Sequence, residues 1–182
     1  MLRILSYVVL ILLIISPYVW ADELSTVEAA LRVIFPAASF VDKKQLVLSQ
    51  EQIRSVEASA QITFAQAHSE NVTVYIIKDG KTVVGYAFED SVIGKWGPIH
   101  YLTGLDPKGS VVQVVILDYK EIRGRPISKK RFLKQYKGKT TSDEIMLRTD
   151  IDGITGATIS SRSLTDGVRK TLHIYELIKS NL

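Results

Sequence analysis

The chain has 182 residues, a formal net charge of +4 and no cysteine. Its ordinary apolar and charged fractions predict one globular domain rather than two, without disorder. The absence of cysteine excludes disulfides, a lipid-modified cysteine, a CxxCH haem attachment and cysteine-bound iron–sulfur clusters, so any redox group must be held in another way.

The N-terminal residues have the pattern of an export signal. One positive residue precedes the apolar run ILSYVVLILLIIS, and Val19 and Ala21 occupy the small-residue positions of a signal-peptidase site before Asp22. We interpret residues 1–21 as a cleaved signal peptide. The alternative is an uncleaved membrane anchor, because the apolar residues 4–19 approach the roughly 17 residues needed to span a bilayer. In both cases we expect the remaining chain in the periplasm or another extracytoplasmic compartment.

Residues 22–70 are predicted as an N-terminal helical segment. The first helix, STVEAALRVIF, has Ser25 as its N-cap and Glu28 three residues later, which is the arrangement of a capping box, and a proline ends it. The second helix, SQEQIRSVEASA, begins after Ser49. The domain that follows this segment is predicted to span residues 71–182.

This domain opens with strands. NVTVYIIKDGKTVVGYAFED contains two β-branched runs around an Asp-Gly pair, which predicts a β-hairpin. IHYLTGL and SVVQVVILDY, separated by a turn at Pro107–Gly109, add at least two more strands. The later segment EIMLRTDI is predicted as an edge strand or an extended segment.

Two helices follow the strands. SKKRFLKQYKG predicts a short helix closed by Gly138, and the last helix is predicted from about Ile159 to Ser180. Its apolar face is formed by Leu164, Val168, Leu172 and Tyr175. The whole pattern predicts an α+β fold, in which helices pack on an antiparallel sheet.

The segment DGITGAT, Asp152 to Thr158, directly precedes the last predicted helix. Gly156 and Ala157 leave no bulk beside Thr158. Thr158, Ser160 and Ser161 place hydroxyl and backbone N–H groups at a helix start, where the helix dipole favours an anion such as phosphate. The alternative is an ordinary N-cap after a turn, because Gly, Ser and Thr commonly cluster before helices. The residues alone leave both interpretations open.

This segment resembles the flavinylation motif of the FMN-binding domain family, which is found in subunits of the Na⁺-translocating NADH:quinone reductase and of the Rnf complex. The motif reads Asp, two free positions, Ser or Thr, Gly, Ala, Thr. Every specified position is matched, by Asp152, Thr155, Gly156, Ala157 and Thr158. The resemblance implies that Thr158 carries FMN through a phosphoester to its side-chain oxygen, attached outside the cytoplasm by a magnesium-dependent FAD:protein FMN transferase.

A weaker similarity to the family extends from Val74 to Ile178 and includes an acidic turn that lies against the isoalloxazine ring in the family. The quinone-reductase subunits have Glu-Thr-Pro-Gly there, whereas this chain has Glu-Ile-Arg-Gly. The resemblance therefore implies ring contacts from Glu121, Arg123 and Gly124, and the departure indicates a stand-alone branch rather than a subunit of those complexes. Arg123 would stabilise the anionic reduced flavin, or else it is one more solvated basic residue.

For several other candidate residues, a structural role is an alternative to a functional one. Trp96 and His100 could shield or protonate a flavin, but such side chains among strands more often pack and satisfy one another. His68 and His173 have no ligand spacing, so we expect no metal site. The basic run Lys120–Lys139 is interpreted as a solvated face, with a surface for an acidic partner or a phosphate as the alternative, and export argues against nucleic acid.

We therefore expect an exported flavoprotein in which covalent FMN carries electrons between a membrane donor and an extracytoplasmic acceptor. The sequence contains no nucleophile elbow and no P-loop, so we expect an electron-transfer component without catalytic residues of its own rather than a free-standing enzyme. The alternative is a non-redox binding or regulatory module that keeps the FMN-binding fold.

Overall fold

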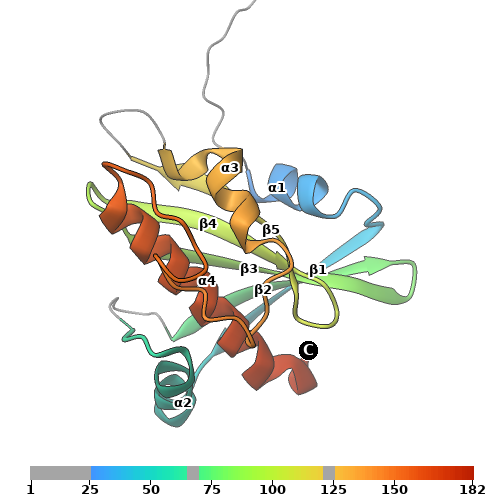
Figure 1. Ribbon diagram of the computed structural model, residues 1–182. Helices are drawn as coiled ribbons and strands as arrows, with labels where there is room; N and C mark the ends of the chain where they lie inside the picture. Colours follow the sequence, from blue (N-terminus) through green and yellow to red (C-terminus); the bar gives the residue numbers. More distant parts are fainter. Residues whose placement is uncertain (1–25, 65–69, 121–125) are drawn as a thin grey trace, which may run out of the picture.

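The computed structural model describes residues 26–64, 70–120 and 126–182. Within these ranges, the centre of the molecule is a five-stranded antiparallel sheet whose strands lie side by side in chain order (Figure 1). This is the α+β fold that the sequence predicts. In chain order the elements are α1 (Val27–Ile34), β1 (Phe40–Val47), α2 (Gln50–Ala60), β2 (Asn71–Asp79), β3 (Thr82–Ile93), β4 (Pro98–Leu105), β5 (Val111–Tyr119), the 3₁₀ turn η1 (Pro126–Ser128), α3 (Lys130–Leu133), the 3₁₀ turn η2 (Lys134–Tyr136), α4 (Thr158–Ile178) and the 3₁₀ turn η3 (Lys179–Asn181).

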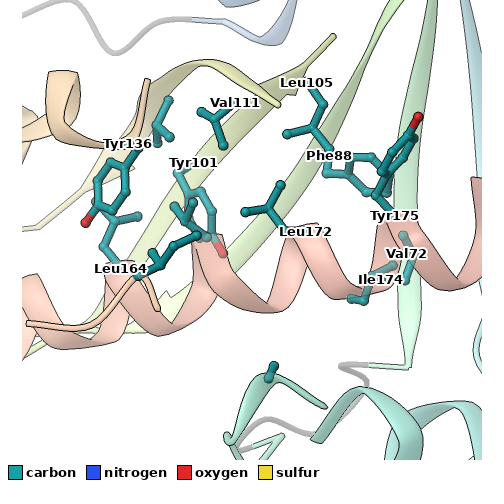
Figure 2. Packing of buried hydrophobic residues seen from close by; sticks show 14 of the residues in the cluster. Val72, Phe88, Tyr101, Leu105, Val111, Tyr136, Leu164, Leu172, Ile174 and Tyr175 are labelled. Atoms are coloured by element: carbon teal, nitrogen blue, oxygen red, sulfur yellow. The ribbon is translucent and has the colours of Figure 1, made fainter. Parts of the chain in front are cut away.

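Helices cover both faces of the sheet. α4 crosses one face, with α2 against its side, and α1 packs on the other face. The successive β4 residues Tyr101 and Leu102 belong to the two separate cores, because side chains alternate between the faces of a strand. The apolar face predicted for α4 is confirmed, since the core beneath the helix contains Leu164, Val168, Leu172 and Tyr175. Figure 2 shows Leu164, Leu172 and Tyr175 pointing into this core.

Both predicted strand pairs are confirmed. β2 and β3 meet at Gly80, whose φ of +58° lies in the left-handed region that favours glycine. β4 and β5 are joined by the turn at residues 107–109, where Gly109 N donates to Asp106 O at 3.0 Å. The middle of the sheet therefore follows directly from local sequence signals.

Strand β1 lies in the segment that the sequence predicts to be helical, and it was not predicted. It pairs with β2 from Phe40 opposite Lys78 to Val47 opposite Asn71. The strand occupies an edge of the sheet, and most of its side chains are exposed or half-buried, so its sequence FVDKKQLV lacks a strong apolar alternation. The predicted division between residues 70 and 71 consequently falls between two paired strands.

Two local predictions are wrong. The N-cap of α1 is Thr26, whose Oγ1 accepts from Ala29 N at 3.2 Å, whereas the predicted cap Ser25 lies outside the described residues. The segment EIMLRTDI, predicted as an edge strand or an extended segment, forms turns with one isolated bridge between Leu147 and Ile151, and Ile145 and Arg148 have positive φ. The start of α2 is confirmed, with Ser49 in a complete capping box.

Gly167 lets α4 pass close to the sheet. A Cβ at this position would overlap with Tyr101 Oη and lie 2.8 Å from Val92 Cγ1. Tyr101 Oη donates to Asp90 Oδ2 at 2.6 Å, and Lys170 Nζ of α4 pairs with the same carboxylate oxygen at 2.8 Å. Burial first, and then Asp90, raise the pKa of Tyr101 well above its ordinary value, so the phenol stays a donor. A polar contact thus fixes the helix above the apolar core.

Among the helices that the structure describes, none combines the length and the apolar character that crossing a bilayer requires.

Candidate functional site

The N-terminus of α4 has no side-chain cap. Its N-cap residue is Ala157, and the first turn of the helix contains no acidic residue. The first hydrogen bond at this end runs from Ser161 N to Ala157 O at 2.9 Å, which leaves the N–H groups of Thr158 and Ile159 without an acceptor within the helix. The positive end of the helix dipole is therefore free to bind an anion.

Two of the hydroxyl groups near this helix end are buried. Ser160 and Ser161 have no exposed surface. Ser160 Oγ accepts from Lys95 N at 3.2 Å, and Ser161 Oγ accepts from Ile154 N at 3.3 Å. Ser160 was predicted to contact a cofactor, but the structure places its hydroxyl against the loop between β3 and β4.

The other two hydroxyl groups, those of Thr155 and Thr158, belong to exposed residues. In the described part of the chain, the Thr158 hydroxyl has no hydrogen-bond partner. Gly156 has a φ of +84°, so it is required by its backbone conformation, since a Cβ there would meet nothing. Ala157 is buried. The predicted motif therefore presents one hydroxyl at the open end of the helix dipole, that of Thr158.

The loop between β3 and β4 lies against this helix end. Gly94 N donates to Gly97 O at 2.8 Å, and a Cβ on Gly94 would come within 3.0 Å of Ser160 Oγ. This close approach brings the loop residues Lys95 and Trp96 to the start of α4, and Lys95 Nζ lies 5.0 Å from the centre of the Trp96 ring.

Exposed apolar side chains accumulate here. Trp96 is 53% exposed, Ile159 is 55% exposed, and Ile93 just before the loop is 56% exposed. An exposed apolar surface of this kind indicates contact with a ligand or a partner. His100, by contrast, is engaged elsewhere, because its Nε2 lies 3.0 Å from Glu89 Oε1. Trp96 is thus available to a ligand, and His100 is satisfied within the protein.

Several residues that were predicted to belong to the site lie outside the part of the chain that the structure describes. Glu121, Arg123 and Gly124 lie outside the described residues, as does His68. Among the side chains that are described, no three or more His, Asp or Glu residues gather in a way that could hold a metal ion.

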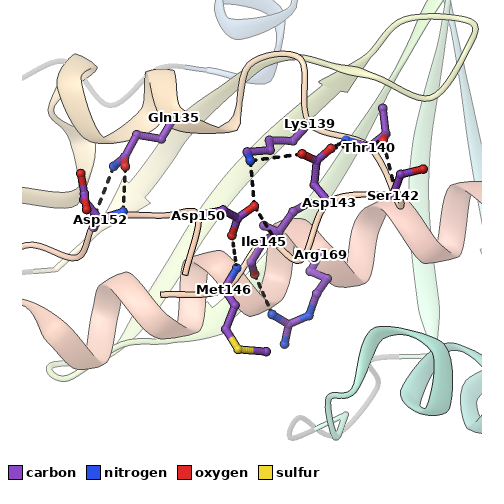
Figure 3. A network of polar contacts seen from close by, with 10 residues as sticks. All are labelled: Gln135, Lys139, Thr140, Ser142, Asp143, Ile145, Met146, Asp150, Asp152 and Arg169. Atoms are coloured by element: carbon purple, nitrogen blue, oxygen red, sulfur yellow. Dashed lines mark hydrogen bonds and ion pairs between the residues drawn. The ribbon is translucent and has the colours of Figure 1, made fainter. Parts of the chain in front are cut away.

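A hub of hydrogen bonds at Asp150 holds the turn that leads into the motif (Figure 3). Asp150 accepts from Met146 N at 2.8 Å, from Ile145 N at 3.1 Å and from Lys139 Nζ at 2.7 Å. Burial acts to raise the pKa of Asp150, but Lys139 and the two amides outweigh it and hold the pKa below its ordinary value. Ile145 has a φ of +45°, which is unusual for a β-branched residue, so this turn needs such support.

Arg169 of α4 links this turn to α2. Its Nη1 donates to Ile145 O at 2.7 Å, its Nε donates to Ala60 O at 2.6 Å, and its Nη2 pairs with Asp166 Oδ1 at 2.9 Å. The side chain is almost completely buried. Sequence reasoning missed Arg169. The available signal was a charged residue four positions after Thr165, on the flank of the apolar face of the helix.

The backbone of Asp152 is held by Gln135 of η2 (Figure 3). Asp152 N donates to Gln135 Oε1 at 2.8 Å, and Gln135 Nε2 donates to Asp152 O at 3.1 Å. Asp152 is exposed, and its carboxylate has no partner among the described residues. The structure therefore leaves both the Asp152 carboxylate and the Thr158 hydroxyl accessible.

A cavity of about 640 Å³ opens between α2, β3 and α4, further along the helix than Thr158. Its charged side chains are already engaged: Glu57 accepts from Phe64 N, Asp166 pairs with Arg169, and Lys170 pairs with Asp90. The described residues that line this cavity therefore offer no unpaired cation to a phosphate group. The start of α4 is the better anion site.

Comparison with known proteins finds similarity over the segment that contains this site. The family model described as "FMN-binding domain" matches residues 94–173, which run from the β3–β4 loop into α4. The chain is 27% identical over 133 residues to the G subunit of the Na(+)-translocating ferredoxin:NAD(+) oxidoreductase complex of Acetobacterium woodii, covering 68% of this chain and 64% of the relative. It is 28% identical over 112 residues to the G subunit of an ion-translocating oxidoreductase complex of Stutzerimonas stutzeri, covering 56% of this chain and 49% of the relative.

The matched regions span about half to two thirds of the length of these curated relatives. The family match contains the loop with Trp96, the turn around Asp150 and the start of α4 with Thr158. Residues 94–173 therefore match the FMN-binding domain family, and the relatives that are similar to this chain are G subunits of oxidoreductase complexes.

Proposed function

We propose that this protein is an electron-transfer flavoprotein that carries FMN covalently on Thr158. The match of residues 94–173 to the family model described as "FMN-binding domain" supports the cofactor. The observation that carries the proposal is the difference between the nearby hydroxyl groups: those of Ser160 and Ser161 are buried and bonded, whereas Thr158 is exposed at the uncapped end of α4. A phosphate on Thr158 Oγ1 would carry its negative charge at the positive end of this helix.

The attachment proposed from the family resemblance is a transfer from FAD. The Thr158 oxygen forms a bond to the FMN phosphorus, the P–O bond of the pyrophosphate breaks, and AMP leaves with the bridging oxygen. The hydroxyl proton passes to a base of the magnesium-dependent transferase. The protein therefore contributes an accessible acceptor and an electrostatic site for the product, and bound FMN supplies the storage of electrons.

The exposed apolar surface beside Thr158 is proposed to contact the flavin ring. Trp96 and Ile159 are both more than half exposed. Ile159 follows the acceptor in the chain, and Trp96 follows Lys95, whose N–H donates to Ser160 Oγ in the first turn of α4. Glu121, Arg123 and Gly124 are proposed as further ring contacts on the basis of the family resemblance. The protein would thereby orient the ring and tune its potential.

The proposed partners are the FAD:protein FMN transferase, a membrane electron donor and an extracytoplasmic acceptor. Both relatives are named as subunits of ion- or Na(+)-translocating oxidoreductase complexes. This favours work within or beside such a membrane complex over the stand-alone branch that the altered acidic turn indicated. An extracytoplasmic location is consistent with a covalent link, because a dissociable FMN would diffuse away.

The intact mass of the mature protein tests covalent attachment. The protein exported together with the transferase is expected to gain the mass of one FMN less one water and to fluoresce on a denaturing gel, because only a covalent flavin survives denaturation. An unmodified mass, in a host that loads another member of the family, would favour the non-redox binding or regulatory module.

N-terminal sequencing tests export. Protein purified from its native host is expected to begin at Asp22, because Val19 and Ala21 precede it at the positions that signal peptidase requires. Recovery of a chain that begins at Met1 from the membrane fraction would instead establish the anchor formed by residues 4–19.

A further inference from the structure

Gln135 holds Asp152, the first residue of the motif, at two points. The side-chain amide accepts from Asp152 N at 2.8 Å and donates to Asp152 O at 3.1 Å. If the amide were turned by 180°, its NH₂ group would face the N–H of Asp152 and its oxygen would face the carbonyl oxygen of Asp152. Only one orientation of the Gln135 amide therefore makes both hydrogen bonds. Two bonds to the same residue fix the direction of its backbone as well as its position.

The element that carries Gln135 is itself tied to α4. The next residue, Tyr136, has no exposed surface, and its Oη lies 2.8 Å from Thr165 Oγ1 of α4. Gln135 therefore connects Asp152 to the helix that begins with Thr158. Both ends of the motif are therefore held relative to α4.

The segment between these ends has few other contacts. Ile154 N donates to Ser161 Oγ at 3.3 Å, and Ala157 N donates to Ile154 O at 2.9 Å. Gly153 and Gly156 are exposed, and glycine restricts the backbone least. Asp150 and the buried Ile151 hold the turn before the motif, and Gln135 adds the two hydrogen bonds that fix the backbone of Asp152 itself.

We propose that Gln135 is a positioning residue for flavin attachment: by fixing the backbone of Asp152 against α4, it presents the Asp152 carboxylate and the Thr158 hydroxyl together to the transferase. This inference rests on the proposed attachment at Thr158. Gln135 makes no hydrogen bond to the Thr158 hydroxyl, and its hydrogen bonds to the motif are those to the backbone of Asp152. It acts by reducing the number of conformations that the transferase must select among.

The test compares Gln135→Met with Gln135→Glu and with the control Gln113→Met. Methionine keeps the length of the side chain but removes both hydrogen bonds, and glutamate keeps the acceptor for Asp152 N but loses the donor to Asp152 O. Gln113 is an exposed glutamine on β5, away from the motif. Purified transferase, FAD and Mg²⁺ are added to each protein, and the initial rate of gel fluorescence is measured at several protein concentrations.

For Gln135→Met we expect kcat/KM of attachment to fall about tenfold, as the loss of two solvent-accessible hydrogen bonds predicts. Gln135→Glu should have an intermediate rate, and Gln113→Met should match the wild type. The melting temperature should change little in all three proteins. Before any flavin is attached, the amide hydrogen of Asp152 should exchange with solvent faster in Gln135→Met than in the wild type. This measurement detects the lost hydrogen bonds of Gln135 without the transferase.

Attachment at the wild-type rate in Gln135→Met would overturn the inference, as would unchanged exchange of the Asp152 amide. If Gln135→Met does not fold, Gln135→Glu decides, because it retains one of the two bonds. If the wild-type protein gains no flavin, both the proposed function and the inference about Gln135 are wrong. If the wild type and Gln135→Met are labelled equally fast, only the inference about Gln135 is wrong.

Discussion

Thr158→Ala is expected to abolish covalent FMN completely. The substitution removes the only acceptor atom that the motif offers at the open end of α4. The fold should be kept, because the Thr158 side chain is exposed and makes no hydrogen bond to another described residue. Substitutions at such surface positions usually change the free energy of unfolding by less than about 0.5 kcal/mol. In-gel fluorescence and intact mass, read beside the melting temperature, measure both effects.

Three neighbouring hydroxyl groups serve as matched controls. Ser160→Ala and Ser161→Ala remove groups that are buried and already accept hydrogen bonds, so both proteins should still be labelled. Thr155→Ala removes the other exposed hydroxyl, which lies before the helix and away from its first N–H groups. Thr158→Ser should retain part of the attachment, because the hydroxyl survives.

The pattern across these variants separates the possible explanations. A Thr158→Ala protein that still fluoresces, while Thr155→Ala is dark, would show that the motif has been read in the wrong register. If no variant and no wild-type protein is labelled by an active transferase, the segment is an ordinary helix start. Asp152→Ala should slow attachment without removing the acceptor, on the hypothesis that its exposed carboxylate helps the transferase engage the hydroxyl.

The sequence predicts those parts of the fold that local patterns determine. The hairpin at Gly80 follows from an Asp-Gly pair between β-branched runs, and the apolar face of α4 follows from its helical period. β1 was missed because an edge strand with mostly exposed side chains need not alternate between apolar and polar residues. The position of β1 is set by its pairing with β2, and no local pattern in FVDKKQLV predicts this pairing.

The candidate site divides in the same way. The motif resemblance pointed to Thr158, but only the fold shows that the hydroxyls of Ser160 and Ser161 are buried and that of Thr158 is not. The supports of the motif could not be predicted, because they depend on distant parts of the chain. Arg169 reaches Ala60, which lies 109 positions earlier, and Gln135 reaches Asp152, 17 positions later. Such pairs become neighbours only when α2, η2 and α4 have docked.

Arg169→Met is expected to produce the largest loss of stability. Methionine retains the apolar stem of the side chain and removes the guanidinium group, so the change isolates the hydrogen bonds from the packing. The carbonyl groups of Ala60 and Ile145 would lose their Arg169 donors, and both residues are buried. Each buried carbonyl left without a donor costs about 1–3 kcal/mol, so the two together predict a loss of about 2–6 kcal/mol.

Arg169→Met should also affect flavin attachment, because Arg169 supports the turn that precedes Asp152. Ile145 would keep its unusual φ of +45° with support from Asp150 alone, so the turn should open more often. Attachment at a temperature where the variant is still folded should therefore also be slower than in the wild type.

Arg162→Met is the matched control, because Arg162 is an exposed arginine on the same helix and closer to the acceptor. It should leave the free energy of unfolding within about 0.5 kcal/mol of the wild type. Thermal unfolding should place Arg169→Met roughly 10 °C below both proteins, since 1 kcal/mol shifts the melting temperature of a domain of this size by about 2–4 °C. Equal melting temperatures for the two variants would mean that water replaces the guanidinium at both carbonyl groups. In that case α2, the turn around Asp150 and α4 would be held together by their apolar contacts, and the support of the motif would rest on Gln135 and Asp150.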